Sequence, residues 1–213
     1  RIDFNAWCQE LARGRSYVSD GYAHALEFTV NGKPPGHDVT LAEPRAVRIK
    51  AKVAFASQTP LEVAHGGLWP AGGKRLVGDT VILHEPSSSQ PEGVFAQGKR
   101  LVELIVNGFP VASTEVSADD SVHELEFSVK IERSSWIALR HFPQLHTNPV
   151  NVFLAGQPIR ASRKSALWCI GCIEQLWRVR GKGIAEGERE EAQRTFGQVI
   201  EQYRQIAREA AGT

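Results

Sequence analysis

Two stretches of the chain alternate between apolar and polar side chains with a period of two. The first is VRIKAKVAF at 47–55, and the second is LEFSVKI at 125–131. Successive side chains of a β-strand point to opposite faces of the sheet, so this alternation is typical of a strand with one face on a core and the other in water. We therefore expect both stretches to be strands of one layered β domain.

Weaker alternation predicts further strands at 24–30, 79–84, 101–106, 110–116, 135–142 and 150–154. Asn31-Gly32 and Asn107-Gly108 each follow a valine-ended strand, and Asn-Gly readily adopts the positive φ values of tight hairpin turns. The segment 86–98 is polar and is expected to be a surface loop. About eight short strands without intervening helices favour an antiparallel β-sandwich. We expect it to be immunoglobulin-like only in the broad sense, since the Cys–Trp–Cys pattern of true immunoglobulin domains is absent.

Helical periodicity flanks the strand region on both sides. Residues 3–13 predict a short N-terminal helix, with Asp3 as its N-cap and Phe4, Trp7 and Leu11 on one face. Residues 162–180 predict a second helix, capped by Ser162, with Leu167, Ile170 and Ile173 or Trp177 on one face. Residues 185–211 predict a third, whose apolar stripe is Ala192, Phe196, Val199, Tyr203, Ile206 and Ala210. Such a stripe needs a partner surface, so we expect the last two helices to pack on each other and on the sandwich.

The composition excludes several classes of protein. Of 213 residues, 42% are apolar and 23% charged, which is ordinary for a globular domain, and the net charge is +1. A net charge this small gives no overall field to attract nucleic acid, so we expect no nucleic-acid partner. The unbroken apolar runs are too short to span a bilayer. Because the first residue is Arg1 rather than methionine, we expect the sequence to be part of a longer polypeptide.

The seven histidines include no His-x-His or His-x-x-x-His pair, the spacings that would suggest a metal site. One stretch, RHFPQLHTNP at 140–149, is dense in polar side chains and lies between two predicted strands. Its candidate functional residues are Arg140, His141, His146 and Asn148. Three interpretations stay open: a turn with local hydrogen bonds, a binding or interdomain surface, and a metal site. We expect this chain to hold neither a metal nor a cofactor.

The segment WCIGC at 168–172 is similar to the Trp-Cys-x-x-Cys of thioredoxin-like oxidoreductases. In those proteins the first cysteine follows a strand and begins a helix, which lowers its pKa. Here the preceding residues are themselves helical, so Cys169 and Cys172 are expected to be small apolar groups within a helix. Cys8 is expected to be buried. No nucleophile elbow, phosphate-binding loop or His-Glu-x-x-His motif is present, and we expect no catalytic activity from this chain alone.

Several segments resemble one family in consistent order. WCQELARGRSYVSDG at 7–21 is similar to the segment that ends the catalytic domain of CehA/McbA-type metallohydrolases, relatives of carbaryl hydrolase in the PHP (polymerase and histidinol phosphatase) superfamily. FTVNGKPPG at 28–36 and VELIVNG at 102–108 resemble their downstream β-rich region. Matches to larger members are SSWIALR at 134–140, HTNPV at 146–150 and PIRAS at 158–162. The similarity covers nearly the whole chain.

This resemblance implies a C-terminal accessory region in an exported bacterial hydrolase. Residues 1–16 would be the tail of a missing catalytic domain, 17–157 the sandwich, and 158–213 a helical hairpin packed on it. The divalent metal would lie in the missing domain, which would be the main partner. One alternative is a carbohydrate-binding module that uses Trp69, Tyr22 or the 141–148 loop. Another is a dithiol redox protein that uses Cys169 and Cys172.

Overall fold

A computed structural model describes residues 3–60 and 98–210, together with Val63 and the backbone of 74–77, 80–83 and 95–96. Its helices are α1 (Phe4–Ala12), α3 (Arg163–Arg180) and α4 (Glu186–Glu209), with a 3-10 turn, η1 (Gly181–Gly183), between the last two. The first seven strands are β1 (Tyr17–Ser19), β2 (Ala23–Val30), β3 (Asp38–Leu41), β4 (Arg45–Phe55), β5 (Thr59–Pro60), β6 (Lys74–Val77) and β7 (Thr80–Leu83). The other seven are β8 (Phe95–Ala96), β9 (Lys99–Val106), β10 (Phe109–Ser117), β11 (Val122–Ile131), β12 (Ser135–His141), β13 (Leu145–Thr147) and β14 (Val150–Leu154).

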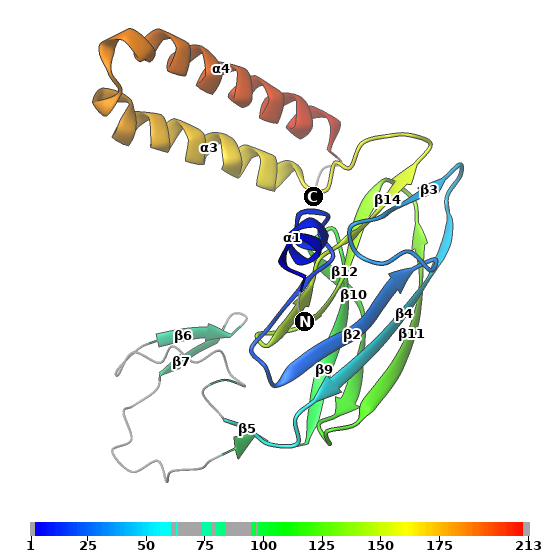
Figure 1. The fold of residues 1–213 in the computed structure, drawn as a ribbon. Helices are drawn as coiled ribbons and strands as arrows, with labels where there is room; N and C mark the ends of the chain where they lie inside the picture. Colours follow the sequence, from blue (N-terminus) through cyan, green and yellow to red (C-terminus); the bar gives the residue numbers. More distant parts are fainter. Residues whose placement is uncertain are drawn as a thin grey trace.

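Two sheets form the sandwich, and the predicted fold class is confirmed (Figure 1). The small sheet has the order β11-β4-β2 and is antiparallel. The large sheet contains β1, β3, β9, β10, β12, β13 and β14, with β12 paired to β9, β13 and β14. Strands β14 and β3 run parallel, which is a departure from the purely antiparallel arrangement predicted.

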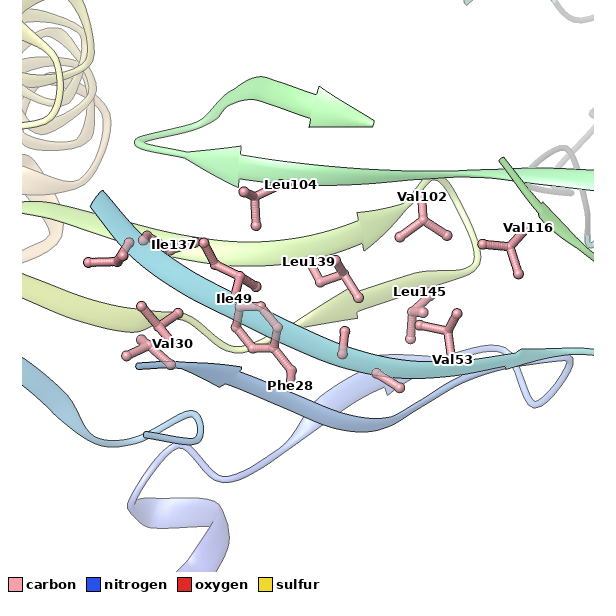
Figure 2. Close-up of a cluster of buried hydrophobic side chains, with 14 of the residues drawn as sticks. Phe28, Val30, Ile49, Val53, Val102, Leu104, Val116, Ile137, Leu139 and Leu145 are labelled. Atoms are coloured by element: carbon pink, nitrogen blue, oxygen red, sulfur yellow. The ribbon is translucent and has the colours of Figure 1, made fainter. Parts of the chain in front are cut away.

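The core lies between the two sheets (Figure 2). Alternate residues of β4, including Ile49 and Val53, point into it and meet Leu104, Leu139 and Leu145 from the large sheet. The intervening β4 residues carry positive charges on the opposite face. There Arg48 pairs with Glu126, and Lys52 Nζ lies 3.3 Å from Glu124 Oε1 on β11. The alternation in the sequence therefore predicts correctly which face of the small sheet is buried.

The two Asn-Gly turns have different outcomes. Asn107 and Gly108 have φ values of 52° and 92° and join β9 to β10 in the predicted hairpin. Asn31 and Gly32 also have positive φ, but they close a tight turn between Val30 and Lys33. The chain then leaves the sheet, and β2 pairs with β4 instead. A turn motif fixes the local backbone without fixing which strand follows.

The last two helices form a hairpin that projects from one end of the sandwich (Figure 1). Ser162 caps α3 as predicted, its Oγ accepting from Ser165 N at 3.1 Å. The rings of Trp177 on α3 and Phe196 on α4 lie 5.1 Å apart. At the base, Arg160 Nε donates to Glu209 Oε2 at 2.5 Å.

The hairpin differs from the sequence expectation in two respects. The apolar faces of α3 and α4 pack mainly on each other rather than on the sandwich. The buried residues of α3 are Ala166 and Ile170, whereas Leu167, which the sequence pattern predicts on the packed face, is exposed. The face of α3 that carries Ala166 and Ile170 is covered by the partner helix. Among the described residues, neither α3 nor α4 is apolar enough over its length to cross a bilayer.

Candidate interdomain site

Two of the candidate residues lie in one cross-strand row on the outer face of the large sheet. The backbone register aligns Val18 with His146, His146 with Arg140, and Arg140 with Glu103. Arg140 Nε and Nη2 both donate to Glu103 Oε2, at 2.9 and 2.8 Å. His146 is exposed, and its Nδ1 lies 2.7 Å from the carbonyl oxygen of Thr147. Arg140 is therefore engaged by a carboxylate, while His146 faces solvent beside it.

Apolar side chains border this row. Val18 is 74% exposed and Phe142 is 67% exposed. Leu101 is also exposed and precedes Glu103 by two positions on β9, so it lies on the same face of the sheet. An ion pair bordered by several exposed apolar side chains is typical of a surface that contacts another protein. Single apolar residues scattered over a surface would not indicate such a contact.

His141 belongs to the opposite face of β12 and is buried. Its Nδ1 lies 2.8 Å from Leu101 O, its Nε2 lies 3.2 Å from Gln144 Oε1, and the edge of its ring meets Phe55. Gln144 Nε2 in turn donates to Asp20 Oδ2 at 2.8 Å. Burial lowers the pKa of His141. The structure thus separates His141 from Arg140 and His146 and places it among core contacts.

Asn148 fastens the segment that follows α1. Its Nδ2 donates to Gly14 O at 3.1 Å and to Ser16 Oγ at 2.9 Å, and its backbone N donates to Ser16 O at 3.1 Å. Gly36 lies directly against this segment, because a Cβ at that position would be 1.9 Å from Arg13 O. Any side chain larger than hydrogen would therefore displace the connection between α1 and β1.

An arginine links α1 to the loop that precedes β3. Arg15 Nη1 donates to Glu10 Oε2 at 2.5 Å, and Arg15 Nη2 lies 3.1 Å from His37 Nε2. The hydrogen bond from Arg15 lowers the pKa of the Glu10 carboxyl. A guanidinium can only donate, so His37 accepts through Nε2. The C-terminal end of α1 is thus held by Asn148 on one side and Arg15 on the other.

The apolar face of α1 is not covered by the described residues. Asp3 caps the helix as predicted, accepting from Ala6 N at 3.1 Å, but α1 contains no buried residue. Phe4 is 73% and Trp7 55% exposed, and Leu11 is also exposed. Cys8 is exposed, so the expectation that it would be buried is wrong. Its neighbours on the helix face solvent too, because nothing among the described residues packs against this face.

The other cysteines lie within α3, as expected. Cys169 is half-buried and Cys172 exposed, and neither is at a helix N-terminus. Electrostatic repulsion from Cys169, together with a hydrogen bond to it, raises the pKa of Tyr203 on α4. The contacts of Cys169 are therefore those of a packed helix pair.

The structure brings together one polar cluster that sequence reasoning missed. Asp119 Oδ1 accepts from Ser121 Oγ at 2.6 Å and lies 2.9 Å from His123 Nε2. Hydrogen bonds from Ser121 and His123 lower the pKa of Asp119 to about 2. The three groups meet at one carboxylate oxygen, whereas a catalytic triad needs histidine to contact the acid and the hydroxyl through different ring nitrogens. The cluster is a turn-stabilising arrangement.

The described residues bear on the metal and carbohydrate sites considered from the sequence. Within the described residues, no group of three or more His, Cys, Asp and Glu side chains is arranged to hold a metal ion. Tyr22, a candidate for carbohydrate binding, is half-buried. Trp69 and most of the 86–98 segment lie outside the described residues.

Comparisons with known proteins add little. No sequence model of a known family matches, and no curated protein matches. Among solved structures, a β-glucosidase from Listeria innocua in complex with isofagomine is similar, with 11% identity, 62% of this chain covered and a TM-score of 0.27. For the same enzyme in complex with glucose, the identity is 8%, the covered share of this chain is 65% and the TM-score is 0.27. This chain covers 16% of each enzyme chain, and a TM-score of 0.27 carries no argument about function.

Proposed function

We propose that this chain is a non-catalytic accessory region of a metal-dependent hydrolase, which braces the catalytic domain or shapes access to its site. The observation that carries the proposal is α1. Its Phe4, Trp7 and Leu11 form an apolar face that stays in solvent, although the helix is fastened firmly at its C-terminal end. Isolated helices of fewer than about 12 residues are marginal in water, so α1 needs a packing partner.

The resemblance to CehA/McbA-type metallohydrolases supplies that partner. In those proteins the segment that matches 7–21 ends the catalytic domain, so α1 would be its last helix. The outer face of the large sheet, with Val18, Phe142 and the Arg140–Glu103 pair, would extend the contact. On the same resemblance, we propose that the hydrolase is exported and that its divalent metal lies in the catalytic domain.

Metal content and hydrolysis test this proposal together. The purified chain, dialysed and examined by elemental analysis, should hold no stoichiometric metal and should hydrolyse neither esters nor phosphodiesters. Each metal ligand needs supporting hydrogen bonds from a second set of residues, whereas His141 already has both nitrogens engaged, and His146 lies opposite Arg140, which is cationic. One equivalent of metal in the chain, lost in His141→Ala or His146→Ala, would overturn the accessory role.

A further inference from the structure

Helix α3 has a second, exposed stripe besides the face that packs on α4, apolar except for one glutamine. Trp168, Cys172, Gln175 and Val179 follow spacings of four, three and four residues, so they lie along one side of the helix. We call this set the outer stripe. Trp168 is 70% exposed, and Cys172, Gln175 and Val179 are exposed as well. Since Ala166 and Ile170 are the buried residues, the outer stripe points away from α4.

A glycine beside the outer stripe gives it a notch. Gly171 lies in the interior of α3, where glycine is less favourable than alanine for a helix. A Cβ built at Gly171 has no atom of the described residues within 4 Å, so packing in the described part of the chain does not require the glycine. A missing side chain at this position allows the backbone of another helix to approach α3 closely, between Trp168 and Gln175.

The charges beside the outer stripe are positive. Lys164 and Arg178 lie along one edge of it, about 40° and about 80° around the helix from Trp168, and the acidic residue of α3, Glu174, lies farther round on that side, at about 120°. Over its length α3 carries four basic residues and one acidic residue. Charge complementarity fixes orientation and partner choice more than affinity, so this arrangement selects an acidic partner.

We infer that the outer stripe of α3 binds an amphipathic α-helix whose apolar face is bordered by carboxylates. Trp168 and Val179 would contact its apolar residues, Gly171 would allow close approach, and Lys164 and Arg178 would face its acidic border. The added helix would pack on the hairpin as a third member of a bundle. The inference goes beyond the accessory role and does not depend on α1.

Two other occupants fit less well. Pairing of two copies through the outer stripe would place Lys164 and Arg178 of both chains in one interface, and like charges there disfavour association. A lipid surface would leave the amide of Gln175, in the middle of the stripe, without hydrogen-bond partners in hydrocarbon. A helix can offer Gln175 a polar side chain at the matching position.

Two synthetic peptides of about 21 residues, long enough to be helical, provide the probe. Both have leucine at the a and d positions, and they differ in having glutamate or lysine at the flanking positions. We expect the full chain to bind the glutamate peptide in calorimetry and the lysine peptide at least tenfold more weakly. The glutamate peptide should slow thiol labelling of Cys172 and leave Cys8 on α1 unaffected, which gives an internal reference.

Variants sharpen the result. Trp168→Ala and Gly171→Leu should each reduce affinity for the glutamate peptide at least tenfold, whereas Leu26→Ala, at an exposed leucine on β2, should leave it unchanged. Gly171→Ala should raise the thermal stability of the hairpin and still weaken binding. The inference would be overturned by equal affinity for both peptides, by affinity for neither, or by binding that is insensitive to Trp168→Ala. It would also be overturned if the chain partitioned onto phosphatidylglycerol vesicles more strongly than it bound the glutamate peptide, or if its mass doubled in sedimentation.

Discussion

The sandwich and the helical hairpin are both built from regular apolar patterns, but they bury those patterns to different degrees. Within the sandwich, side chains as large as Phe55, Ile49 and Leu104 are fully buried between two sheets. In the hairpin, the buried side chains are Ala166, Ile170, Ala207 and Ala210, while Phe196 and Tyr203 are half-buried. Each sheet contributes a whole face to a common core, whereas each helix contributes a stripe to a single neighbour.

This difference shows that a periodic pattern predicts an element and its apolar face but not how completely that face is covered. The stripe of α4 from Ala192 to Ala210 has its partner in α3, and α3 still carries an unpaired outer stripe. How much of an apolar face is buried depends on how many elements pack against it. We therefore expect most of the free energy of unfolding to come from the sandwich, and the uncovered apolar surface to lie on α1 and the hairpin.

The largest expected effect compares two leucines. Leu139→Ala removes a fully buried side chain from the core between the sheets and should lower the free energy of unfolding by about 2–5 kcal/mol. Leu176→Ala on α3 removes an exposed side chain and should change it by less than about 0.5 kcal/mol. Urea unfolding followed by circular dichroism measures both. Similar losses for the two variants would contradict the contrast between the regions.

Phe196→Ala should have an intermediate effect. A fully buried phenylalanine costs about 3–5 kcal/mol when truncated, and the half-buried Phe196 should therefore cost about 1–2 kcal/mol. The loss should appear as faster hydrogen exchange in α3 and α4, with β4 and β9 unchanged, because the hairpin packs mainly on itself. Gln198→Ala, at an exposed position of α4, is the matched control. Faster exchange in the strands as well would show that the hairpin is part of the sandwich core.

Asn148→Ala tests the fastening of α1 and should have a smaller effect. It removes two side-chain hydrogen bonds, to Gly14 O and Ser16 Oγ, worth about 1 kcal/mol in net terms. Proteolysis between residues 12 and 17 should become faster while the unfolding midpoint of the sandwich changes little. Asn151→Ala removes an exposed hydrogen bond to Asp38 and serves as the control. Equal cleavage rates in the two variants would show that Asn148 does not hold the segment after α1 in place.

The smallest effect concerns the turn at Asp119. Its pKa in the fold is about 2, below the ordinary 3.8, so its ionised form is favoured by folding. That contribution is complete above pH 4 and is lost as the pH falls from about 4 to about 2. Ser121→Ala removes the hydrogen bond that lowers the pKa of Asp119 most, so the titration midpoint of the Asp119 carboxyl should rise. Nuclear magnetic resonance measures this midpoint. An ordinary midpoint in the unmodified chain would contradict the contacts seen.

Much of the fold follows from local pattern, and the missed elements are the short ones. Alternation predicts β2, β4, β7, β9, β10, β11, β12 and β14, and helical periodicity predicts α1, α3 and α4. The missed strands contain two to four residues each, which leaves little alternation to recognise, and three of them, β1, β3 and β13, belong to the large sheet. Their positions depend on pairing with distant strands, such as Tyr17 opposite Thr147.

The candidate site was predictable in part. Strand parity could have separated the two histidines, because His141 continues the buried series Ile137 and Leu139, whereas His146 falls opposite Arg140. The role of Asn148 could not be predicted, since its partners Gly14 and Ser16 are more than 130 positions away in sequence. The outer row of Arg140 and Glu103 likewise depends on the register between β12 and β9.

The proposed accessory role requires the apolar face of α1 to pack on a catalytic domain that precedes it. The thiol of Cys8 lies on that helix and is exposed in this chain, so its labelling rate reports directly on coverage. We expect rapid labelling of Cys8 in this chain and at least tenfold slower labelling in a polypeptide that also carries the proposed catalytic domain before α1, with Cys172 as the reference on the hairpin. Equal labelling of Cys8 in both proteins would contradict it.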